Sequence, residues 1–264
     1  MILTSKSQFQ HCLETTAEHQ FIANYNGLTL SSVYQPIFDI DESIFGVEAL
    51  VRIKDANGNP IRPDHFFCSD TFCYEDKINV ERLSRVIHLR NFAQSDFRHK
   101  QLFLNVLPIA GERLATEDLK NGLLASRIQH IGLKNSQIVM ELIELDCENL
   151  RYLETAVEKL NQNGFNVAID DFGVNASTEA RVLQVKPHIL KMDRSLLLQY
   201  CSGDHAPLLS ALQLAKRIGA QTVIEGIETA QQLNAMRALN IDLYQGFHLA
   251  MPVMLPAKIV LPSN

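Results

Sequence analysis

Two adjacent carboxylates stand at the end of a short apolar run in the middle of the chain. Val167–Ile169 leads into Asp170 and Asp171, which are followed by Phe172 and Gly173. The run is typical of a strand buried on both faces, yet adjacent carboxylates repel each other and resist removal from water. A divalent cation bound by both would remove that repulsion, because hard cations prefer oxygen ligands. Taken alone, the pair is equally typical of a solvated turn.

Polar side chains recur at the ends of other apolar runs. They are Glu48, Asn105, Glu141, Lys191, Glu225 and Gln245. Any single acid at such a place is more often a helix N-cap or a solvated side chain than a ligand. If these ends converge, two divalent ions that share Asp170 and Asp171 would neutralise the acids and activate water for in-line attack at phosphorus. An all-oxygen ligand set favours magnesium or manganese over zinc.

Two basic residues accompany the acids. Lys191 lies between Leu190 and Met192, and a lysine inside an apolar strand needs a partner carboxylate or a route to water. An acidic site offers both, and there Lys191 would orient water or stabilise charge on a phosphoryl group. Arg52 would either clamp a phosphate through two hydrogen bonds or pair with an acid.

The elements that would position these residues alternate between strands and helices. Strands are predicted at 32–38, 45–52, 102–106, 138–144, 167–169, 188–193, 222–225 and 243–247, and helices at 76–97, 114–129, 148–162, 177–184, 205–218 and 229–239. This alternation predicts an α/β fold in which a parallel sheet closes into a (β/α)8 barrel, with the carboxyl ends of the strands at one mouth. The first two strands are joined by a short turn and are therefore predicted to pair antiparallel.

Two residues fit this pattern less simply. Glu48 lies inside its predicted strand and not at the end of it. Pro36 cannot donate a ladder hydrogen bond, so we expect it at the end of the first strand.

A single domain is predicted over residues 1–264, because no change in composition marks a linker. That length suits one large α/β barrel. Residues 29–255 are expected to form the barrel core. Residues 1–28 are expected to form a helical lead-in, with a helix over residues 5–25 that ends before the Asn26–Gly27 turn.

Composition limits the classes of function. The hydrophobic content is 46%, the charged content is 20% and the formal net charge is −6, as in a globular protein with a full core. An acidic chain is not expected to bind duplex nucleic acid, which normally requires a basic surface, although metal ions would still let it hold an anionic substrate. No apolar run reaches the roughly 18 residues of a membrane span, and charges occupy the place of a signal peptide's apolar stretch.

The cysteines favour a reduced, cytoplasmic protein. Their number is odd and no Cys-x-x-Cys pair occurs among Cys12, Cys68, Cys73, Cys147 and Cys201. This pattern is typical of free thiols. Zinc at Cys68 and Cys73 is disfavoured, because no second pair with ligand spacing follows them.

A series of short motifs occurs in one order between about Tyr34 and Pro252. They are Tyr34–Ile37, Glu48–Leu50 with Arg52, Asn105 with Pro108, Glu141 with Glu144, Asp170–Gly173, Leu190–Ser195, Glu225–Thr229 and Gln245–Phe247. Together they resemble the EAL family of cyclic di-GMP phosphodiesterases. The resemblance implies a modified TIM (β/α)8 barrel with an antiparallel first strand. It also implies hydrolysis of cyclic di-GMP to linear pGpG with two Mg²⁺ or Mn²⁺ ions, in the control of motility and biofilm formation.

The resemblance also assigns roles to residues. By that resemblance, the metals are held by Glu48, Asn105, Glu141, Asp170, Asp171 and Glu225. Lys191 would assist the attacking water, and Glu48 and Glu225 would also take part in catalysis. Gln35, Arg52 and Gln245 would contact the nucleotide, with Gln245 also supporting the site. Glu144 and Glu228 would support it too, Glu144 by anchoring the loop after Gly173.

That loop departs from the family. Val174–Thr178 replaces the usual Thr-Gly-Tyr-Ser-Ser, so that Asn175 stands in place of a glycine. Residues 66–74 also lack the usual Ile-Pro-x-Ala-Glu pattern. Three functions therefore remain open: an active cyclic di-GMP phosphodiesterase, a receptor that binds the nucleotide or a partner protein without turnover, and an enzyme for another phosphodiester. A homodimer and a regulatory protein partner are compatible with the first two.

Overall fold

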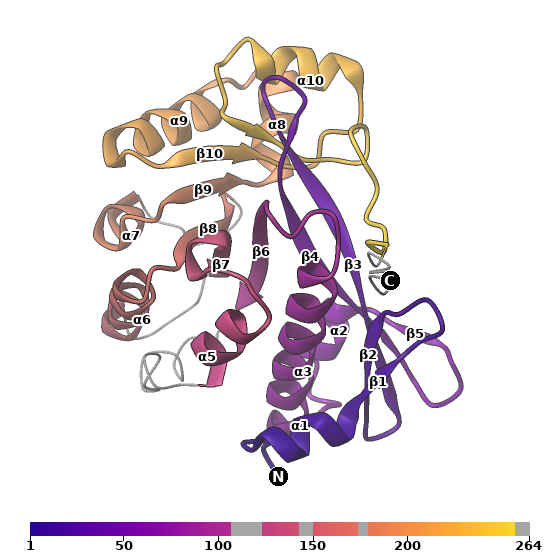
Figure 1. The fold of residues 1–264 in the computed structure, drawn as a ribbon. Coiled ribbons are helices and arrows are strands. Elements are labelled where there is room, and N and C mark those ends of the chain that lie inside the picture. The colour runs from indigo at the N-terminus through magenta and orange to yellow at the C-terminus, as the bar shows by residue number, and fades with distance from the viewer. Residues whose placement is uncertain (107–122, 143–149, 174–178, 257–264) are drawn as a thin grey trace, which may run out of the picture.

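The computed structural model describes residues 1–106, 123–142, 150–173 and 179–256. Its central element is a closed barrel of eight strands (Figure 1). In chain order the strands are β3 (Leu28–Asp39), β4 (Ile44–Lys54), β6 (Gln101–Val106), β7 (Ile138–Leu142), β8 (Asn166–Phe172), β9 (Ile189–Met192), β10 (Gln221–Ile224) and β11 (Leu243–Tyr244).

Strand pairing confirms the predicted barrel. Around the barrel the order is β3-β11-β10-β9-β8-β7-β6-β4, and the pairing of β3 with β4 closes the ring. β3 runs antiparallel to both of its neighbours, whereas the neighbours from β4 through β11 pair parallel. The short turn at residues 40–43 thus joins an antiparallel hairpin, as predicted.

Helices pack around the barrel, and α5, α6, α7 and α9 cover one side of it in Figure 1. The bounds are α2 (Pro63–Cys68), α3 (Tyr74–Ala93), α5 (Leu123–His130), α6 (Leu150–Gln162), α7 (Glu179–Val185), α8 (Arg194–Cys201), α9 (Ala206–Ile218) and α10 (Ala230–Arg237), with a 3-10 turn at Asn135–Gln137. The largest hydrophobic cluster joins the outer faces of the strands to these helices, except for α2. Of the helix predicted at 114–129, only the part from Leu123 lies within the described residues.

A separate apolar layer fills the inside of the barrel. Every barrel strand except β4 supplies one buried residue to it: Ile37, Phe103, Val139, Ala168, Ile189, Val223 and Leu243. On β4 the equivalent position is Gly46, where a Cβ would lie 2.9 Å from the Phe103 ring. Phe103 therefore takes the space that a side chain on β4 would fill, and the barrel is closed below its mouth.

The predicted helix over residues 5–25 is wrong. The helix α1 covers only Lys6–Cys12, and the chain continues as β1 (Leu13–Thr15) and β2 (Phe21–Tyr25), which extend the sheet from β3. β-branched and aromatic residues in this segment favour strands, and β3 offers an edge for them. A second apolar core lies here, in which Phe9, Leu30 and Leu83 pack together. The lead-in is thus a small mixed layer and not a helix.

Pro36 lies inside β3 and not at its end. The backbone N–H of Tyr34 points away from β4, because it donates to Val253 O at 2.7 Å. Alternate residues of a strand point the same way, so the nitrogen of Pro36 also faces away from β4. Pairing with β11 begins only at Phe38, and the proline therefore removes no ladder hydrogen bond.

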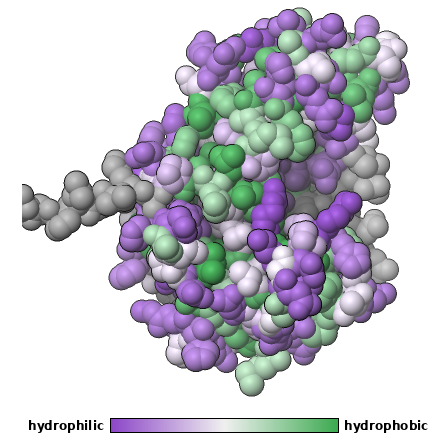
Figure 2. Space-filling model, turned by 90° about the vertical axis from the view of Figure 1, so that its right-hand side faces the viewer, coloured by the Kyte–Doolittle hydropathy of each residue, from purple (hydrophilic) through white to green (hydrophobic). Residues whose placement is uncertain are grey.

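The surface in Figure 2 is largely hydrophilic, with hydrophobic residues gathered across the middle of the face that carries β2, β3 and the short β5 (Pro60–Ile61). Among the described residues, no helix is long and apolar enough to cross a membrane.

Candidate active site

One layer of polar side chains lies directly above the apolar layer of the barrel. On a strand, side chains two residues apart point to the same face. Two residues beyond the apolar layer, toward the mouth, the chain carries Gln35, Glu48, Asn105, Glu141, Asp170, Lys191, Glu225 and Gln245, of which Glu225 and Gln245 directly follow β10 and β11. The sequence therefore places these side chains together wherever the barrel forms.

This arrangement explains the position of Glu48 within its strand. β4 pairs with β6 only over Gly46–Ala49, and beyond that point it continues in the long hairpin with β3. The mouth of the barrel thus opens at the middle of β4. Glu48 is at the mouth although it is not at the end of its strand, and it is directly opposite Gln35 on β3.

A bulge in β8 brings Asp170 and Asp171 to one side. Adjacent residues in a regular strand point to opposite faces, but the β8–β9 register shifts between Ile169 and Phe172. Asp171 has a φ of 55°, in the left-handed region that aspartate tolerates better than most residues. Carboxylate oxygens of Asp170, Asp171 and Glu225 consequently lie within 4.8 Å of one another.

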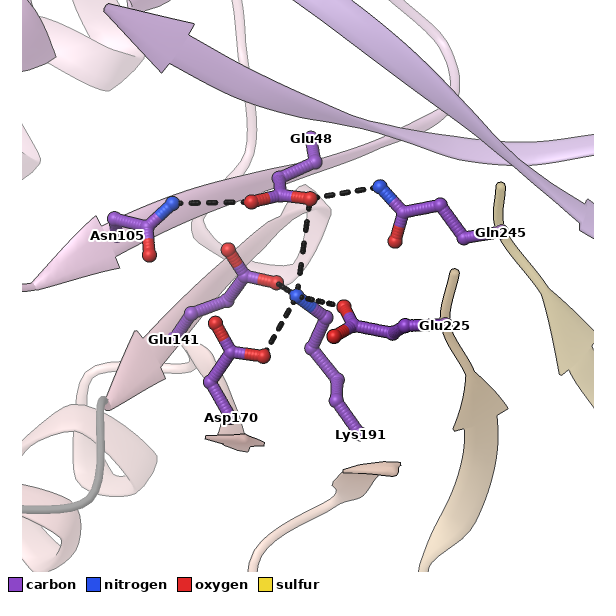
Figure 3. Close-up of polar contacts among 7 residues, drawn as sticks. All are labelled: Glu48, Asn105, Glu141, Asp170, Lys191, Glu225 and Gln245. Atoms are coloured by element: carbon purple, nitrogen blue, oxygen red, sulfur yellow. Dashed lines mark hydrogen bonds and ion pairs between the residues drawn. The ribbon is translucent and has the colours of Figure 1, made fainter. Parts of the chain in front are cut away.

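Lys191 lies at the centre of the acids (Figure 3). Its Nζ is 2.6 Å from Glu141 Oε1, 2.6 Å from Glu225 Oε1, 2.9 Å from Asp170 Oδ1 and 3.8 Å from Glu48 Oε2. The lysine is 1% exposed and Glu141 is fully buried. The partner carboxylates that a lysine in an apolar strand requires are therefore present, as the sequence predicted.

Two amides hold Glu48 from opposite sides (Figure 3). Gln245 Nε2 donates to Glu48 Oε2 at 2.7 Å, and Asn105 Nδ2 donates to Glu48 Oε1 at 3.2 Å. The carbonyl oxygens of both amides therefore point away from Glu48 (Figure 3). Gln245 Oε1 is buried and accepts no hydrogen bond from a described residue.

Residues 23–252 match the family model of the EAL domain. This range covers most of the chain. The chain belongs to the EAL domain family.

Curated relatives of this EAL domain include enzymes named for one nucleotide. A probable cyclic di-GMP phosphodiesterase of Escherichia coli (strain K12), PdeN, is 29% identical over 230 residues, which cover 84% of this chain and 43% of PdeN. RocR, a cyclic di-GMP phosphodiesterase of Pseudomonas aeruginosa, is 26% identical over 227 residues, which cover 83% of this chain and 56% of RocR. The chain thus spans less than two thirds of the length of each relative.

Solved structures agree on the fold. The Bacillus subtilis YkuI protein, with an EAL domain in complex with cyclic di-GMP and calcium, aligns with a TM-score of 0.75 at 24% identity, over 87% of this chain and 57% of that one. Klebsiella pneumoniae BlrP1, in complex with manganese and cyclic di-GMP, aligns with a TM-score of 0.73 at 23% identity, over 85% of this chain and 56% of that one. At such identities the likeness establishes the barrel alone.

Electrostatics in this EAL domain are dominated by burial of like charges. Burial, reinforced by Asp170, raises the pKa of Asp171 to about 6. Burial likewise raises the pKa of Glu225 to about 8, although Lys191 opposes it, and raises the pKa of Glu141 well above its usual range. Burial disfavours the charged form of Lys191, but Asp170, Glu141, Glu225 and Glu48 raise its pKa well above the usual value. The single ammonium of Lys191 therefore does not neutralise this set of acids.

The donor set fits divalent cations. All candidate ligand atoms are oxygens, as magnesium, manganese and calcium prefer. Glu141 Oε2 is buried and accepts no hydrogen bond within the described parts of the chain, so it has coordination capacity to offer. Asp170, Asp171 and Glu225 form the cluster with metal-ligand spacing. A divalent ion would satisfy the orphan oxygen and lower the repulsion that raises these pKa values.

The remaining predicted residues lie around this cluster or outside the described structure. Gln35 is buried and donates through Nε2 to Ala250 O at 3.3 Å. Arg52 is exposed on the part of β4 beyond the mouth, where it donates to Val51 O. Glu228 forms an ion pair with Arg194 and is not part of the cluster of acids. Glu144, Pro108 and the loop Val174–Thr178 lie outside the described residues.

Arg194 contacts the loop that carries Glu225, and sequence analysis did not single it out. It follows Asp193 at the start of α8 and reaches the loop that carries Glu225. A signal was present, because Gly226 directly after Glu225 marks a place where another group approaches the backbone closely.

Proposed function

We propose that this EAL domain hydrolyses cyclic di-GMP to linear pGpG with two Mg²⁺ or Mn²⁺ ions. Water adds to one phosphorus, the bond from that phosphorus to the ribose 3′ oxygen breaks, and the 3′ oxygen receives a proton. The observation that carries the proposal is the polar layer. The candidate metal ligands lie together at the barrel mouth, and the ammonium of Lys191 lies between them. The names of the curated relatives PdeN and RocR support cyclic di-GMP as the substrate.

The metals would be held by Glu48, Asn105, Glu141, Asp170, Asp171 and Glu225. When bound, they would supply positive charge for the phosphate and lower the pKa of water. Gln245 and Asn105 hold the Glu48 carboxylate by hydrogen bonds. Lys191 keeps an ammonium beside Glu225 and Asp170, where it would orient the attacking water and stabilise charge that develops on the phosphoryl oxygens. Gln35, in the polar layer, and Arg52, on the part of β4 beyond the mouth, would contact the nucleotide.

Turnover by the purified chain tests the proposal. Cyclic di-GMP is incubated with the protein and Mn²⁺ or Mg²⁺, and the products are separated by chromatography. We expect linear pGpG, and we expect Glu141→Gln to form none. The exposed Glu14→Gln, on β1, is a matched control that should retain full activity. Intact nucleotide in every reaction of the metal-loaded wild type would contradict the proposal.

A receptor is the second candidate. It is favoured by the departure of Val174–Thr178 from the family pattern, directly after the strand that carries both adjacent acids. Saturable binding of cyclic di-GMP by the metal-loaded protein without product would support this function. Exchange of Val174–Asn175–Ala176 for Thr-Gly-Tyr separates the two, since it should raise kcat of an enzyme limited by this loop and leave a receptor inactive.

A further inference from the structure

The end of β8, which carries Asp170 and Asp171, and the loop after β10, which carries Glu225, both contact the start of α8. On the side of β8, Asp193 N donates to Phe172 O at 3.2 Å. Gly173, with a φ of 110°, packs on the buried Leu196, so closely that a Cβ at Gly173 would lie 2.7 Å from Leu196 Cγ. The backbone directly after Asp170 and Asp171 is thus held against α8.

On the side of β10, the contact is made by Arg194. Glu225 N donates to Met192 O at 3.1 Å, just before α8 begins. A Cβ at Gly226 would lie 2.5 Å from Arg194 Cγ and 2.7 Å from its Cδ, so the aliphatic part of the arginine lies on the backbone of Gly226. The guanidinium then reaches over the loop to Glu228, with 2.6 Å between Arg194 Nη2 and Glu228 Oε2.

The opposite side of this loop is also fixed. Ile227 N donates to Gln245 O at 3.1 Å, and His248 N donates to Ile227 O at 3.0 Å. Gly246 lies so close to the Ile227 backbone that no side chain would fit between them. The segment from Glu225 to Glu228 is therefore enclosed between the chain after β11 and the side chain of Arg194.

The ion pair alone does not account for this arrangement. Arg194 and Glu228 are 45% and 40% exposed, and pairs with such exposure contribute little to stability. What the arginine adds is a fixed surface over Gly226, one residue from a candidate metal ligand. Outer-shell partners that hydrogen-bond to metal ligands typically change metal affinity or activity by about 10–100-fold when removed, and the lower end of that range is the expectation for a packing contact one residue away.

We propose that Arg194 is a positioning residue for Glu225, and that through it the first turn of α8 sets the distance between Glu225 and the pair Asp170–Asp171. The inference rests on the proposed function only in taking these acids as metal ligands. Loss of Arg194 lets the loop from Glu225 to Glu228 move away from α8 while its hydrogen bonds to Gln245 and His248 remain. Metal affinity then falls although the fold is unchanged.

Calorimetric titration of the metal-free protein with Mn²⁺ alone tests this inference. We expect Arg194→Ala to weaken Mn²⁺ binding by about tenfold, and Arg194→Met, which keeps the aliphatic part over Gly226, to weaken it less. Arg237→Ala is the matched control. Arg237, in α10, pairs with Glu42 at the same distance of 2.6 Å, and Glu42 lies in the β3–β4 turn, at the end of the barrel opposite the mouth. The thermal midpoint of metal-free Arg194→Ala should equal that of this control.

The outcomes are distinguishable. Mn²⁺ binding by Arg194→Ala within twofold of the Arg237→Ala value would overturn the inference and leave the proposed function intact. Equal losses in Arg194→Ala and Arg194→Met would also overturn it, because the aliphatic contact would then have no effect. Absence of Mn²⁺ binding by the unaltered protein would overturn the proposed function, and this inference with it.

Discussion

At the scale of single residues, the site depends on one cation among many acids. Lys191 contacts Glu141, Asp170 and Glu225 within 2.9 Å, and it is almost fully buried. In a buried cluster of this kind, removal of one partner leaves uncompensated charge, which is far more costly than the loss of an exposed pair. The same lysine is the group placed to stabilise charge in the transition state, so its structural and catalytic roles must be separated by measurement.

Lys191→Met makes that separation, because methionine keeps most of the length of the side chain and removes its charge. We expect kcat to fall by about 10²-fold or more with KM nearly unchanged, as for a group used mainly in the transition state. We also expect the thermal midpoint to fall more in the metal-free protein than with Mn²⁺, since divalent ions would neutralise the same carboxylates. Steady-state kinetics and thermal melts, with the exposed Lys216→Met as control, measure both. A raised KM at constant kcat would assign Lys191 to substrate binding instead.

At the scale of elements, α3 is joined to β3 by buried polar contacts. His88 Nδ1 lies 2.8 Å from Ser32 Oγ, and the Tyr34 hydroxyl donates to His88 O at 2.8 Å. The rings of Tyr34 and His88 meet edge to face. Burial, with a smaller contribution from Arg85, lowers the pKa of His88 to about 3. The imidazole is therefore neutral in the folded protein near neutral pH.

This histidine makes stability depend on pH. Between about pH 6.5, the ordinary value for histidine, and pH 3, the unfolded chain binds a proton at His88 and the folded chain does not. The contribution of His88 to stability is thus lost as the pH falls through this window, and from pH 7 to pH 5 that contribution falls by about 2 kcal/mol. Denaturant unfolding at both pH values should show that, from pH 7 to pH 5, the change in the stability of the wild type is less favourable than that of His88→Asn by about 2 kcal/mol. Exposed His99→Asn should behave as wild type, and an unchanged pH dependence in His88→Asn would contradict the assignment.

At the scale of the whole molecule, the sequence predicted the features that follow regular patterns. It missed the features that depend on irregular or long-range contacts. Alternation of apolar runs with helical segments predicted the barrel, and the recurrence of polar residues at strand ends predicted the polar layer. The bulge at Asp171 was not predictable from strand periodicity, because a left-handed residue interrupts the period of two. The contact of Arg194 with Gly226 joins residues far apart in the chain, and local patterns carry no information on such contacts. The strands near the N-terminus were missed because the pairing of β2 with β3, and of β1 with β2, outweighed local helical spacing.

The polar layer also makes a prediction for the stability of the entire fold. A ligand that binds only the folded state stabilises it by about 2.7 kcal/mol at 100 times its Kd, and for a chain of this size each kcal/mol raises Tm by about 2–4 °C. Saturating Mn²⁺ should therefore raise Tm by roughly 5–10 °C. Asp170→Asn should lose most of this gain, because Asp170 belongs to the cluster with metal-ligand spacing, whereas the exposed Asp204→Asn should keep it. Melting curves of the wild type that are the same with Mn²⁺ and with a chelator would show that these acids do not form a divalent site, and the receptor or another function would then have to operate without one.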